Sequence, residues 1–500
     1  MEANKSAGVT YVTVEQSYFE KRGLKRYAGV ASLWALGVGA VISGHFSGWN
    51  LGIASGGWGG MLIAAILIAI MYLGLTFSIA EMSAALPHTG AAYSFARTTM
   101  GPWGGFVTGL CENVEYVVTP AVVVFFIGSY LGSIFETPAE FQPVYWIFGY
   151  IIFVGLNVVG VELSFKVTLV VTLAALACLV AFWVSAIPVM DFSRWALNIG
   201  VGADGAAMEL PEGGGPFLPF GIGGALAAMP FAVWLFLAIE QLPLAAEESI
   251  DPKSDLPKGI ILGILTLIVS AFMILWLNSS VANGAFGLST SAEPLLDGFK
   301  AIYGDGLAKL LAFVAVIGLI ASFHTIIFAQ GRQIYSLSRA GYFPRSLSIT
   351  HGSRKTPHLA MVTGAIVGLV LMLAIWFSLG ADAGGAVIGG TLLNMAVFGA
   401  MLSYIMQAIS FILMRRNMPT IERPYKSIFG IPGAVATILI ALVTIYFQLS
   451  DPVYRAGVFG VALWFAVGII YFAILGRHKL VLSPEEEFAL AKGETEYRTH

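Results

Sequence analysis

Long apolar runs, most of them about 20 residues or more, follow one another along almost the whole chain. That is the length a helix needs to cross the hydrocarbon core of a membrane. The chain is 57% hydrophobic and only 11% charged, whereas soluble proteins carry about 25% charged residues. The sequence therefore predicts an all-α polytopic membrane protein with twelve spans, at about 28–54, 58–84, 103–132, 144–161, 164–188, 218–246, 257–282, 306–336, 357–378, 384–414, 430–449 and 453–475.

Lysine and arginine residues cluster in alternate connections between these runs. Basic residues favour the cytoplasmic side of a membrane, so the pattern predicts two cytoplasmic termini and an even number of spans. The polar, charged leader predicts no cleavable signal peptide, and a bacterial-type cytoplasmic (inner) membrane is the expected location. That orientation leaves four of the 26 basic residues outside: Arg194, Lys300, Lys309 and Arg455.

The sequence gives no sign of enzyme, metal or nucleic-acid chemistry. Cys111 and Cys178 both lie in apolar runs, which is typical of small core residues rather than of a disulfide or a metal pair. Metal-ligand spacing such as HExxH is missing, as is GxSxG. No basic stripe indicates nucleic acid. We therefore expect a protein that is no enzyme, has no cofactor or metal, and has the lipid bilayer as its surroundings.

The first apolar run is interrupted at its middle by the stretch GVGAVISGHFSGWNLG (37–52). A glycine costs about 1 kcal/mol in a helix interior. Backbone that leaves the helix at membrane depth is tolerated only where protein or a water-filled cavity covers it. The stretch therefore indicates a broken span, although close helix packing on small residues would also explain the glycines.

The sixth run is interrupted as well. Pro243 lacks a backbone N–H and clashes one turn back, and the nearby Glu240 is an intramembrane carboxylate, which by default marks a functional site. Breaks in spans 1 and 6 predict two five-helix inverted repeats with a substrate between the breaks. The expected segments are a cytoplasmic N-terminal segment (1–27), the first repeat (28–188), an extracellular loop (189–217), the second repeat (218–414), two peripheral spans (415–475) and a cytoplasmic tail (476–500).

The segment from Ser483 to about Lys492 has the pattern of a short amphipathic helix. Ser483 suits the N-cap, Pro484 suits the first helical position, and the acidic residues 485–487 suit the positive end of the helix. We interpret this segment as part of a solvated cytoplasmic tail.

Several motifs resemble the amino acid–polyamine–organocation (APC) transporter superfamily, in the right order and over nearly the whole chain. The resemblance implies a transporter that works by alternating access, with spans 1, 2, 6 and 7 rocking against spans 3, 4, 8 and 9. The chain is most similar to the ethanolamine permease group, through ISGHFSGWNLGIASGGWGG and GLCENVEYVVTPAVV. The superfamily motifs are LGVGAVI, AEMSAALPHTGAAYSFAR (80–97), LAAEESIDPKSDLPKGI (244–260), RQIYSLSRAGYFPRSL (332–347) and ERPYK (422–426).

One position departs from the amino acid transporters of this superfamily, which typically carry Gly-Ser-Gly where this chain has Ser43-Gly44-His45. Their triplet lets backbone amides close on a substrate carboxylate. The His45 side chain is expected to crowd that approach and to offer a ring donor and acceptor instead. This favours secondary active or potential-driven uptake of a small cationic amino alcohol, either ethanolamine or choline. The alternative is a proton-coupled amino acid permease of the same fold.

The residues expected to bind the substrate lie at the two breaks and on span 3. The spacing of Glu112, Glu115 and Tyr116 puts them on one helix face. Two carboxylates on one face in a membrane need polar groups, a cavity or a cation beside them; a buried, hydrogen-bonded structural pair is the alternative. The predicted contacts, several of them implied by the resemblance, are Ile42, Ser43, Gly44, His45, Glu112, Glu115, Tyr116, Trp234, Leu237, Ala238, Ile239 and Glu240.

Gating and coupling are expected to involve the sixth and eighth spans. The resemblance puts Trp234 at the position of a gating aromatic and Glu240 at an acidic position of proton-sensitive transporters. Two span-8 hydroxyls are too common to indicate sodium, so a coupling proton is favoured over sodium. His324 is either a proton relay or a helix-contact histidine. The predicted gating or coupling residues are Trp234, Glu240, Ser322, His324 and Thr325.

Charged residues at the cytoplasmic ends of the spans have a different interpretation. We expect Glu81, Arg97 and Arg332 to form inner-gate or structural ion pairs rather than to bind substrate. Some proton-coupled proteins of the superfamily carry a lysine in span 5, where this chain has Ala175, so lysine-based coupling is not expected.

Overall fold

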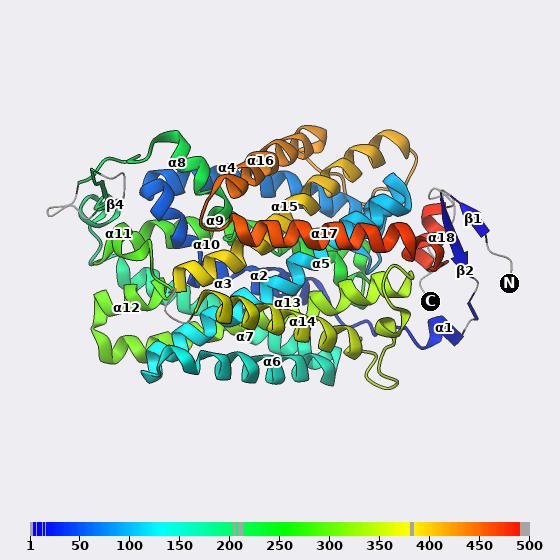
Figure 1. Cartoon of the computed structure of the whole chain (residues 1–500), viewed down its shortest axis with the longest axis horizontal. Helices are drawn as coiled ribbons and strands as arrows, with labels where there is room; N and C mark the ends of the chain where they lie inside the picture. The colour runs from blue at the N-terminus through cyan, green and yellow to red at the C-terminus, as the bar shows by residue number, and fades with distance from the viewer. Residues whose placement is uncertain are drawn as a thin grey trace.

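The computed structural model describes residues 4–6, 8–12, 14–15, 17–203, 207–208, 214–380 and 385–490. In this part of the chain, ten helices are long and apolar enough to cross a membrane. They run roughly along the long axis of the molecule (Figure 1), and the predicted fold class is confirmed. The ten are α4 (Gly52–Ala85), α5 (Ala91–Phe135), α6 (Gln142–Val159), α7 (Val161–Ala186), α10 (Pro252–Ser279), α13 (Asp305–Arg339), α14 (His358–Leu379), α15 (Gly385–Asn417), α16 (Gly430–Ser450) and α17 (Arg455–Ile474).

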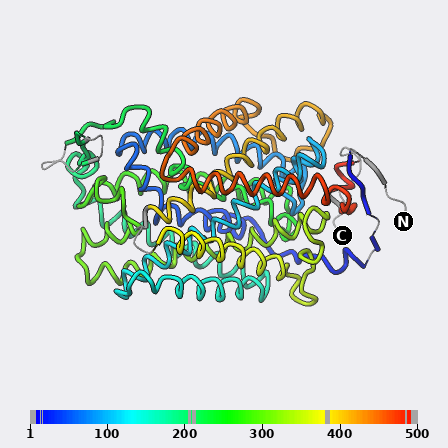
Figure 2. The backbone as a smooth tube through the Cα atoms, in the orientation of Figure 1, coloured from blue at the N-terminus to red at the C-terminus, as the bar shows by residue number. Residues whose placement is uncertain are grey.

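The other two predicted spans are the interrupted ones. The first consists of α2 (Val30–Val41) and α3 (Ser43–Phe46), and the sixth of α8 (Gly221–Ala227), α9 (Met229–Val233) and the 3-10 helix η4 (Ile239–Glu248). Helix α2 packs against α7, α10, α13 and η4, and its blue trace passes through the middle of the bundle in Figure 2. Ten continuous and two interrupted segments are consistent with the predicted count of twelve.

The predicted end of span 1, at about residue 54, is wrong. Helix α3 ends at Phe46, Ser47 is extended, and Gly48 has a φ of 94°, a conformation that favours glycine. The chain then forms η1 (Trp49–Leu51) and enters α4 at Gly52. Hydropathy does not reveal this turn because the residues on both sides of it are apolar.

Two long helices are kinked at glycines with positive φ. In α4 the kink is at Gly57 (φ 66°), so the regular helix after it matches the predicted span 58–84. In α5 the kink is at Gly101 (φ 78°), directly before Pro102, and the helix beyond it matches the predicted span 103–132. The remaining predicted spans agree closely with the observed helices.

Short elements cap both ends of the bundle. Strands β1 (Asn4–Ser6), β2 (Val9–Val12) and β5 (Leu480–Val481) form one sheet in which β2 pairs antiparallel with β1 and parallel with β5. This sheet and α18 (Pro484–Leu490) lie at the same end in Figure 1, as an even number of crossings requires. The others are α1 (Ser17–Glu20), η2 (Ala139–Phe141), the π-helix η3 (Phe192–Ala196), β3 (Gly200–Val201), β4 (Ala207–Met208), α11 (Gly284–Leu288), α12 (Pro294–Tyr303), η5 (Arg345–Ser348) and η7 (Gly476–His478).

Parts of four predicted segments lie outside the described residues. They are 1–3, 7, 13 and 16 of the N-terminal segment, 204–206 and 209–213 of the extracellular loop, 384 at the start of span 10, and 491–500 of the tail, including Lys492.

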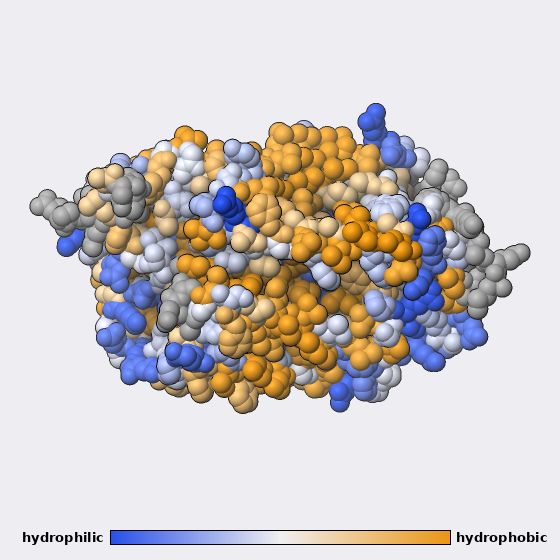
Figure 3. All heavy atoms as spheres, viewed as in Figure 1, coloured by the Kyte–Doolittle hydropathy of each residue, from blue (hydrophilic) through white to orange (hydrophobic). Residues whose placement is uncertain are grey.

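Apolar side chains cover the outside of the bundle as well as its core. Figure 3 shows hydrophobic residues over the middle of one face and hydrophilic residues toward both ends. Phe377 of α14, for example, is 75% exposed. So large an apolar surface is expected where helices face lipid rather than water.

The C-terminal helix is docked onto the bundle, which contradicts our interpretation of a solvated tail. The buried Glu486 carboxylate accepts hydrogen bonds from Arg97 Nε (2.5 Å), Tyr11 Oη (2.8 Å) and Tyr342 Oη (2.9 Å). Its burial raises the pKa of Glu486, against the opposing effects of Arg97 and the two tyrosines. The expected Ser483 cap is also wrong, because its hydroxyl has no hydrogen-bond partner in the part of the chain that the structure describes.

Removing the Glu486 carboxylate should release the tail. Breaking a buried ion pair costs about 3–5 kcal/mol, because the remaining partner, here Arg97, stays buried and uncompensated. In Glu486→Ala we therefore expect hydrogen exchange of the amides in 480–490 to rise by about 100-fold or more. Glu487→Ala, which removes the exposed neighbouring carboxylate, is the control. Wild-type protection in Glu486→Ala would show that the tail is held by other contacts.

Candidate substrate and coupling site

The break in span 1 is bridged by a hydroxyl group from α13. Ser322 Oγ donates a hydrogen bond to the Gly39 carbonyl (2.7 Å) and accepts one from the Ser43 amide (2.8 Å). In an uninterrupted helix that amide would bond to the Gly39 carbonyl itself, so the serine side chain replaces the missing bond. The His45 amide bonds to the Ile42 carbonyl (3.0 Å). Two of the three amides in the Ser43-Gly44-His45 triplet are therefore already used.

The break in span 6 lies against the break in span 1. Ala238 has a φ of 84°, a left-handed conformation that is costly for any residue but glycine. Trp234 Nε1 donates a hydrogen bond to the Ser47 carbonyl (3.0 Å). The Trp234 carbonyl oxygen is only 2.1 Å from where a Cβ atom on Gly44 would lie. The two interrupted helices are thus in direct backbone contact, and Gly44 permits that approach.

The side chain of His45 is used by the protein itself. Its Nε2 lies 3.0 Å from the Leu235 carbonyl, and its Nδ1 lies 3.0 Å from Ser270 Oγ of α10. A carbonyl only accepts, so Nε2 carries a proton and donates it, and in the neutral ring Nδ1 accepts from the serine. Contrary to our expectation, the ring is not free to offer a donor and an acceptor to a substrate; it links spans 1, 6 and 7.

Three buried carboxyl groups gather beside the span-6 break. Glu112, Glu115 and Glu240 are buried: their exposed fractions are 1%, 0% and 2%. Tyr404 Oη of α15 donates to Glu115 Oε1 (3.3 Å), and Tyr116 Oη donates to Glu240 Oε1 (3.5 Å). The carboxyl groups of Glu115 and Glu240 also lie against each other. One oxygen of each glutamate, Oε2, has no hydrogen-bond partner among the described residues.

No positive charge neutralises this cluster in the part of the chain that the structure describes: none of the three carboxylates forms an ion pair with lysine or arginine. An unpaired carboxylate is very costly in a low-dielectric interior. Two carboxyl groups in contact also repel unless one of them carries a proton. The cluster is therefore suited to hold an ammonium group, protons or both. Among the described residues, no group of three or more His, Cys, Asp or Glu could hold a metal ion.

Two tyrosines of this cluster were missed by the sequence reasoning. Tyr404 of α15 binds Glu115, and Tyr72 of α4 lies 3.0 Å from Tyr404, oxygen to oxygen. Nothing in their sequence context separates them from the other buried aromatic residues of apolar helices. Only the packing of α15 against α5, and of α4 against α15 and η4, brings them to the carboxylates.

The other residues predicted at the breaks are buried there. Ile42 lies between α2 and α3, and Leu237, Ala238 and Ile239 lie where α9 gives way to η4. We expected the carbonyls of 237–239 to line the break. That of Ala238 accepts a hydrogen bond from the Gln241 amide (3.3 Å) and is therefore partly used within η4.

The span-8 residues have structural partners. His324 Nδ1 lies 3.0 Å from Asn157 Nδ2, and its Nε2 lies 3.2 Å from Ser164 Oγ. This arrangement favours the helix-contact alternative over a proton relay. The Thr325 hydroxyl donates to two carbonyls of its own helix (2.8 and 3.1 Å). Among the described residues, neither side chain forms a hydrogen bond with the three carboxylates. Of the three predicted span-8 residues, Ser322 is the one that bonds to the backbone at the span-1 break.

The end of the site away from the chain termini is closed by the connection between α11 and α12. Asn50 Nδ2 donates to the carbonyls of Leu288 (2.6 Å) and Ser291 (2.8 Å), and Ser47 Oγ donates to that of Ala292 (3.0 Å). Nearby, Glu293 accepts a hydrogen bond from Ser129 of α5, and burial raises the pKa of Glu293. These contacts cover the chain just after the span-1 break.

Ion pairs close the end that carries the chain termini. The expected pairing of Glu81, Arg97 and Arg332 is confirmed, and the Arg332 pair is completely buried. The predicted site is thus closed toward both ends of the bundle. The pairs are Arg332–Glu248 (2.7 Å), Arg339–Glu247 (2.6 Å), Glu81–Arg415 (2.6 Å) and Arg97–Glu486 (2.5 Å).

Replacing Ser322 by alanine should weaken both folding and transport. It leaves the Gly39 carbonyl and the Ser43 amide buried without a partner, at about 1–3 kcal/mol for each unsatisfied group. We expect a lower melting temperature in detergent and slower uptake. Ser338→Ala, farther along the same helix, is the control, because the Ser338 hydroxyl bonds to the Ile334 carbonyl of its own helix. Equal effects of the two substitutions would show that the bridge has no special role.

A buried polar site between two interrupted helices, closed at both ends, defines a membrane transporter. The chain belongs to the amino acid permease family, which residues 33–483 match. This confirms the resemblance to the superfamily, whose proteins are transporters rather than enzymes. The narrower resemblance to ethanolamine permeases goes beyond this match and stays a prediction.

Similar proteins cover most of the chain. An uncharacterized transporter of Rhizobium meliloti (strain 1021) is 27% identical over 432 residues, 85% of this chain and 87% of its own. Two proteins of Bacillus subtilis (strain 168) are each 24% identical. The methylthioribose transporter matches over 494 residues, 92% of this chain and 96% of its own. The branched-chain amino acid permease matches over 484 residues, 92% and 95% respectively.

Proposed function

We propose that this chain takes up a small organic ammonium compound without a carboxylate, with ethanolamine as the first candidate, across the cytoplasmic membrane by alternating access. The observation that carries the proposal is the cluster of Glu112, Glu115 and Glu240, which is buried and has no basic partner among the described residues. A primary ammonium donates three hydrogen bonds, as lysine does, and its charge compensates the cluster.

The cluster also links the two parts expected to move. Glu240 belongs to span 6, which is expected to rock, whereas Glu112 and Glu115 belong to the scaffold span α5. A cation between them draws the two parts together and favours the closed state. A membrane potential adds about 2.3 kcal/mol per charge per 100 mV, which supports roughly fiftyfold accumulation without a coupled ion.

A proton is the second candidate for the same cluster. Glu115 and Glu240 lie against each other, and a proton between two carboxyl groups removes their repulsion. Arrival of an ammonium would displace that proton, which provides a route to exchange of the ammonium for a proton. Proton symport, exchange and uniport therefore remain distinct mechanisms for one substrate.

The amides at the span-1 break bear on whether the substrate has a carboxylate. In the closed structure the Ser43 amide bonds to Ser322 and the His45 amide bonds to Ile42. A carboxylate would have to compete with both bonds. This supports an amine over an amino acid. The His45 ring does not add to that preference by crowding the site, because it is bonded to Leu235 and Ser270.

A proton-coupled amino acid permease is the second candidate function. The matched family and the branched-chain amino acid permease of Bacillus subtilis favour it over an ethanolamine transporter. The methylthioribose transporter is a relative with a different kind of substrate. The ammonium of an amino acid would also satisfy the three carboxylates. The two candidates therefore differ in whether the transported compound carries a carboxylate.

Uptake into proteoliposomes under an inside-negative potential tests the proposal. Labelled ethanolamine is the substrate, and unlabelled choline, serine, alanine and leucine are competitors. Accumulation of ethanolamine without competition by the three amino acids would support the amine. Strong competition by an amino acid, or no ethanolamine uptake alongside amino acid uptake, would make the permease alternative correct. A second series with an imposed pH gradient separates proton coupling from uniport.

A further inference from the structure

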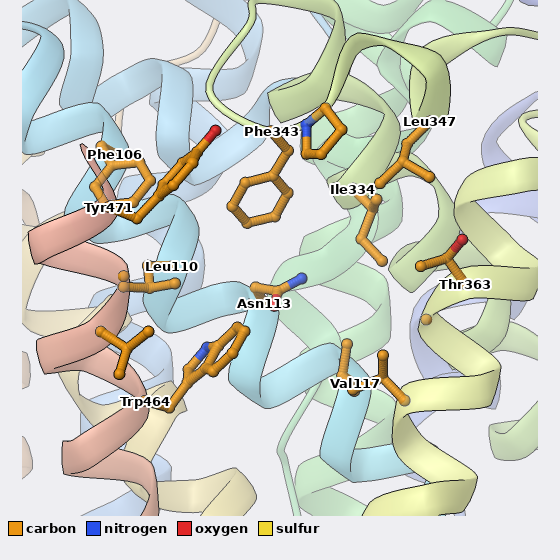
Figure 4. Close-up of a pocket in the computed structure, with 15 residues that line it drawn as sticks. Phe106, Leu110, Asn113, Val117, Ile334, Phe343, Leu347, Thr363, Trp464 and Tyr471 are labelled. Atoms are coloured by element: carbon orange, nitrogen blue, oxygen red, sulfur yellow. The ribbon is translucent and has the colours of Figure 1, made fainter. Parts of the chain in front are cut away.

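A cavity separate from the three carboxylates lies between α5, α13, α14 and α17 (Figure 4). Its volume is about 360 Å³. Its walls are mainly hydrocarbon, from residues such as Leu110, Val117, Ile334 and Trp464. The Asn113 amide in the wall is already bonded to Gln333 (3.2 Å). The cavity therefore offers an apolar surface.

The cavity opens toward the surface that faces lipid. Val367 of α14 and Val467 of α17 both line it, and they are 49% and 52% exposed. Their helices carry many more exposed apolar side chains on the outside of the bundle. In a bilayer the molecules next to such an opening are lipid acyl chains, so a hydrocarbon chain is the occupant that fits the walls.

Basic residues stand at one end of this cavity. Arg345 lies directly after Pro344 and two residues before Leu347, which both line the cavity. Its Nη2 donates to the Lys479 carbonyl (2.7 Å), which brings the segment after α17, with Arg477 and Lys479, to the same place. We call these three residues the basic rim. They belong to the end of the bundle predicted to be cytoplasmic, where the leaflet carries anionic lipids.

We propose that the cavity binds an acyl chain of an anionic phospholipid whose phosphate interacts with the basic rim. The proposal combines an apolar lining, an opening to the bilayer and complementary charge at one end. It does not depend on the identity of the transported substrate. Helix α5 carries Glu112 and Glu115 in the carboxylate cluster and Leu110, Asn113 and Val117 in the cavity wall, so a bound lipid would support the helix that holds two of the site carboxylates.

Binding can be measured by native mass spectrometry of the full-length protein with phosphatidylglycerol or phosphatidylcholine. We expect tighter binding of phosphatidylglycerol, and about thirtyfold weaker binding of it after the double change Arg477→Gln and Lys479→Gln. The double change Arg416→Gln and Lys426→Gln, of exposed basic residues on another segment at the same end, is the control and should have no effect.

A second pair of variants tests the cavity itself. Val467→Trp should fill it and prevent lipid binding, whereas Ile470→Trp, on the exposed face of α17 and not in the lining, should not. Equal binding of phosphatidylglycerol and phosphatidylcholine would overturn the proposal, as would equal loss of binding in the rim double variant and the control double variant. Either result would indicate nonspecific binding of lipid around the protein. Retained binding in Val467→Trp would equally exclude this cavity as the site.

Discussion

Glu240→Gln should reduce accumulation of the transported substrate by about 10- to 100-fold. The substitution keeps the shape of the side chain but removes its charge, and a hydrogen bond to a charged group contributes about 1.5–3 kcal/mol. Glu240 is buried at the span-6 break; its Oε1 is bonded to Tyr116, and its Oε2 has no partner within the described ranges. An ammonium bound there would lose its closest counter-charge on the moving part of the protein.

The measurement is initial-rate uptake of the substrate that the competition assay identifies, at equal amounts of reconstituted protein. Glu162→Gln is the control, because that carboxylate is exposed and pairs with Lys166 in the next turn of its helix. Glu115→Gln should have a smaller effect than Glu240→Gln if the two share a proton, since an amide can still donate to the other carboxylate. Wild-type uptake in Glu240→Gln would exclude this residue from both binding and coupling.

Gly44→Ala should disable the transporter and lower its thermal stability. The new Cβ atom would lie 2.1 Å from the Trp234 carbonyl oxygen and 3.0 Å from its carbonyl carbon. Both are backbone atoms, so no side-chain rotation relieves the clash, and the two interrupted helices would have to separate. Overpacking of this kind costs about 1–3 kcal/mol, and here it also separates the two breaks that form the site.

Gly155→Ala in α6 is the matched control, because a Cβ atom there meets nothing within 4 Å. Alanine favours the helix over glycine by about 1 kcal/mol, so this variant should be at least as stable as the wild type and should transport normally. Thermal unfolding in detergent and uptake in proteoliposomes are both measured. If Gly44→Ala matched the control in both assays, the close contact between the two breaks would be unnecessary for transport.

The spans could be predicted because hydropathy and helix length are local properties. The eighth span, expected at 306–336, is α13 (Asp305–Arg339), and the peripheral spans match α16 and α17 closely. The breaks in spans 1 and 6 could also be predicted, because glycine, proline and an intramembrane carboxylate mark them within the stretch itself. The end of span 1 was missed because the turn at Gly48 lies between two apolar stretches.

Partners that are distant in the sequence were decided by the tertiary structure alone. The direction of the His45 ring depends on Leu235 and Ser270, about 200 residues away, and the burial of Glu486 depends on Arg97 and Tyr11. The spacing of Glu112 and Glu115 predicts that they share one face of span 3. It does not predict that Glu240 and Tyr404 lie beside them. The local sequence predicts which segments are long and apolar enough to cross a membrane and where two of them break, since each segment carries that information in its own residues. Which side chains satisfy the exposed backbone and compensate the buried charges was decided by helix packing, because those contacts join residues that no local pattern connects.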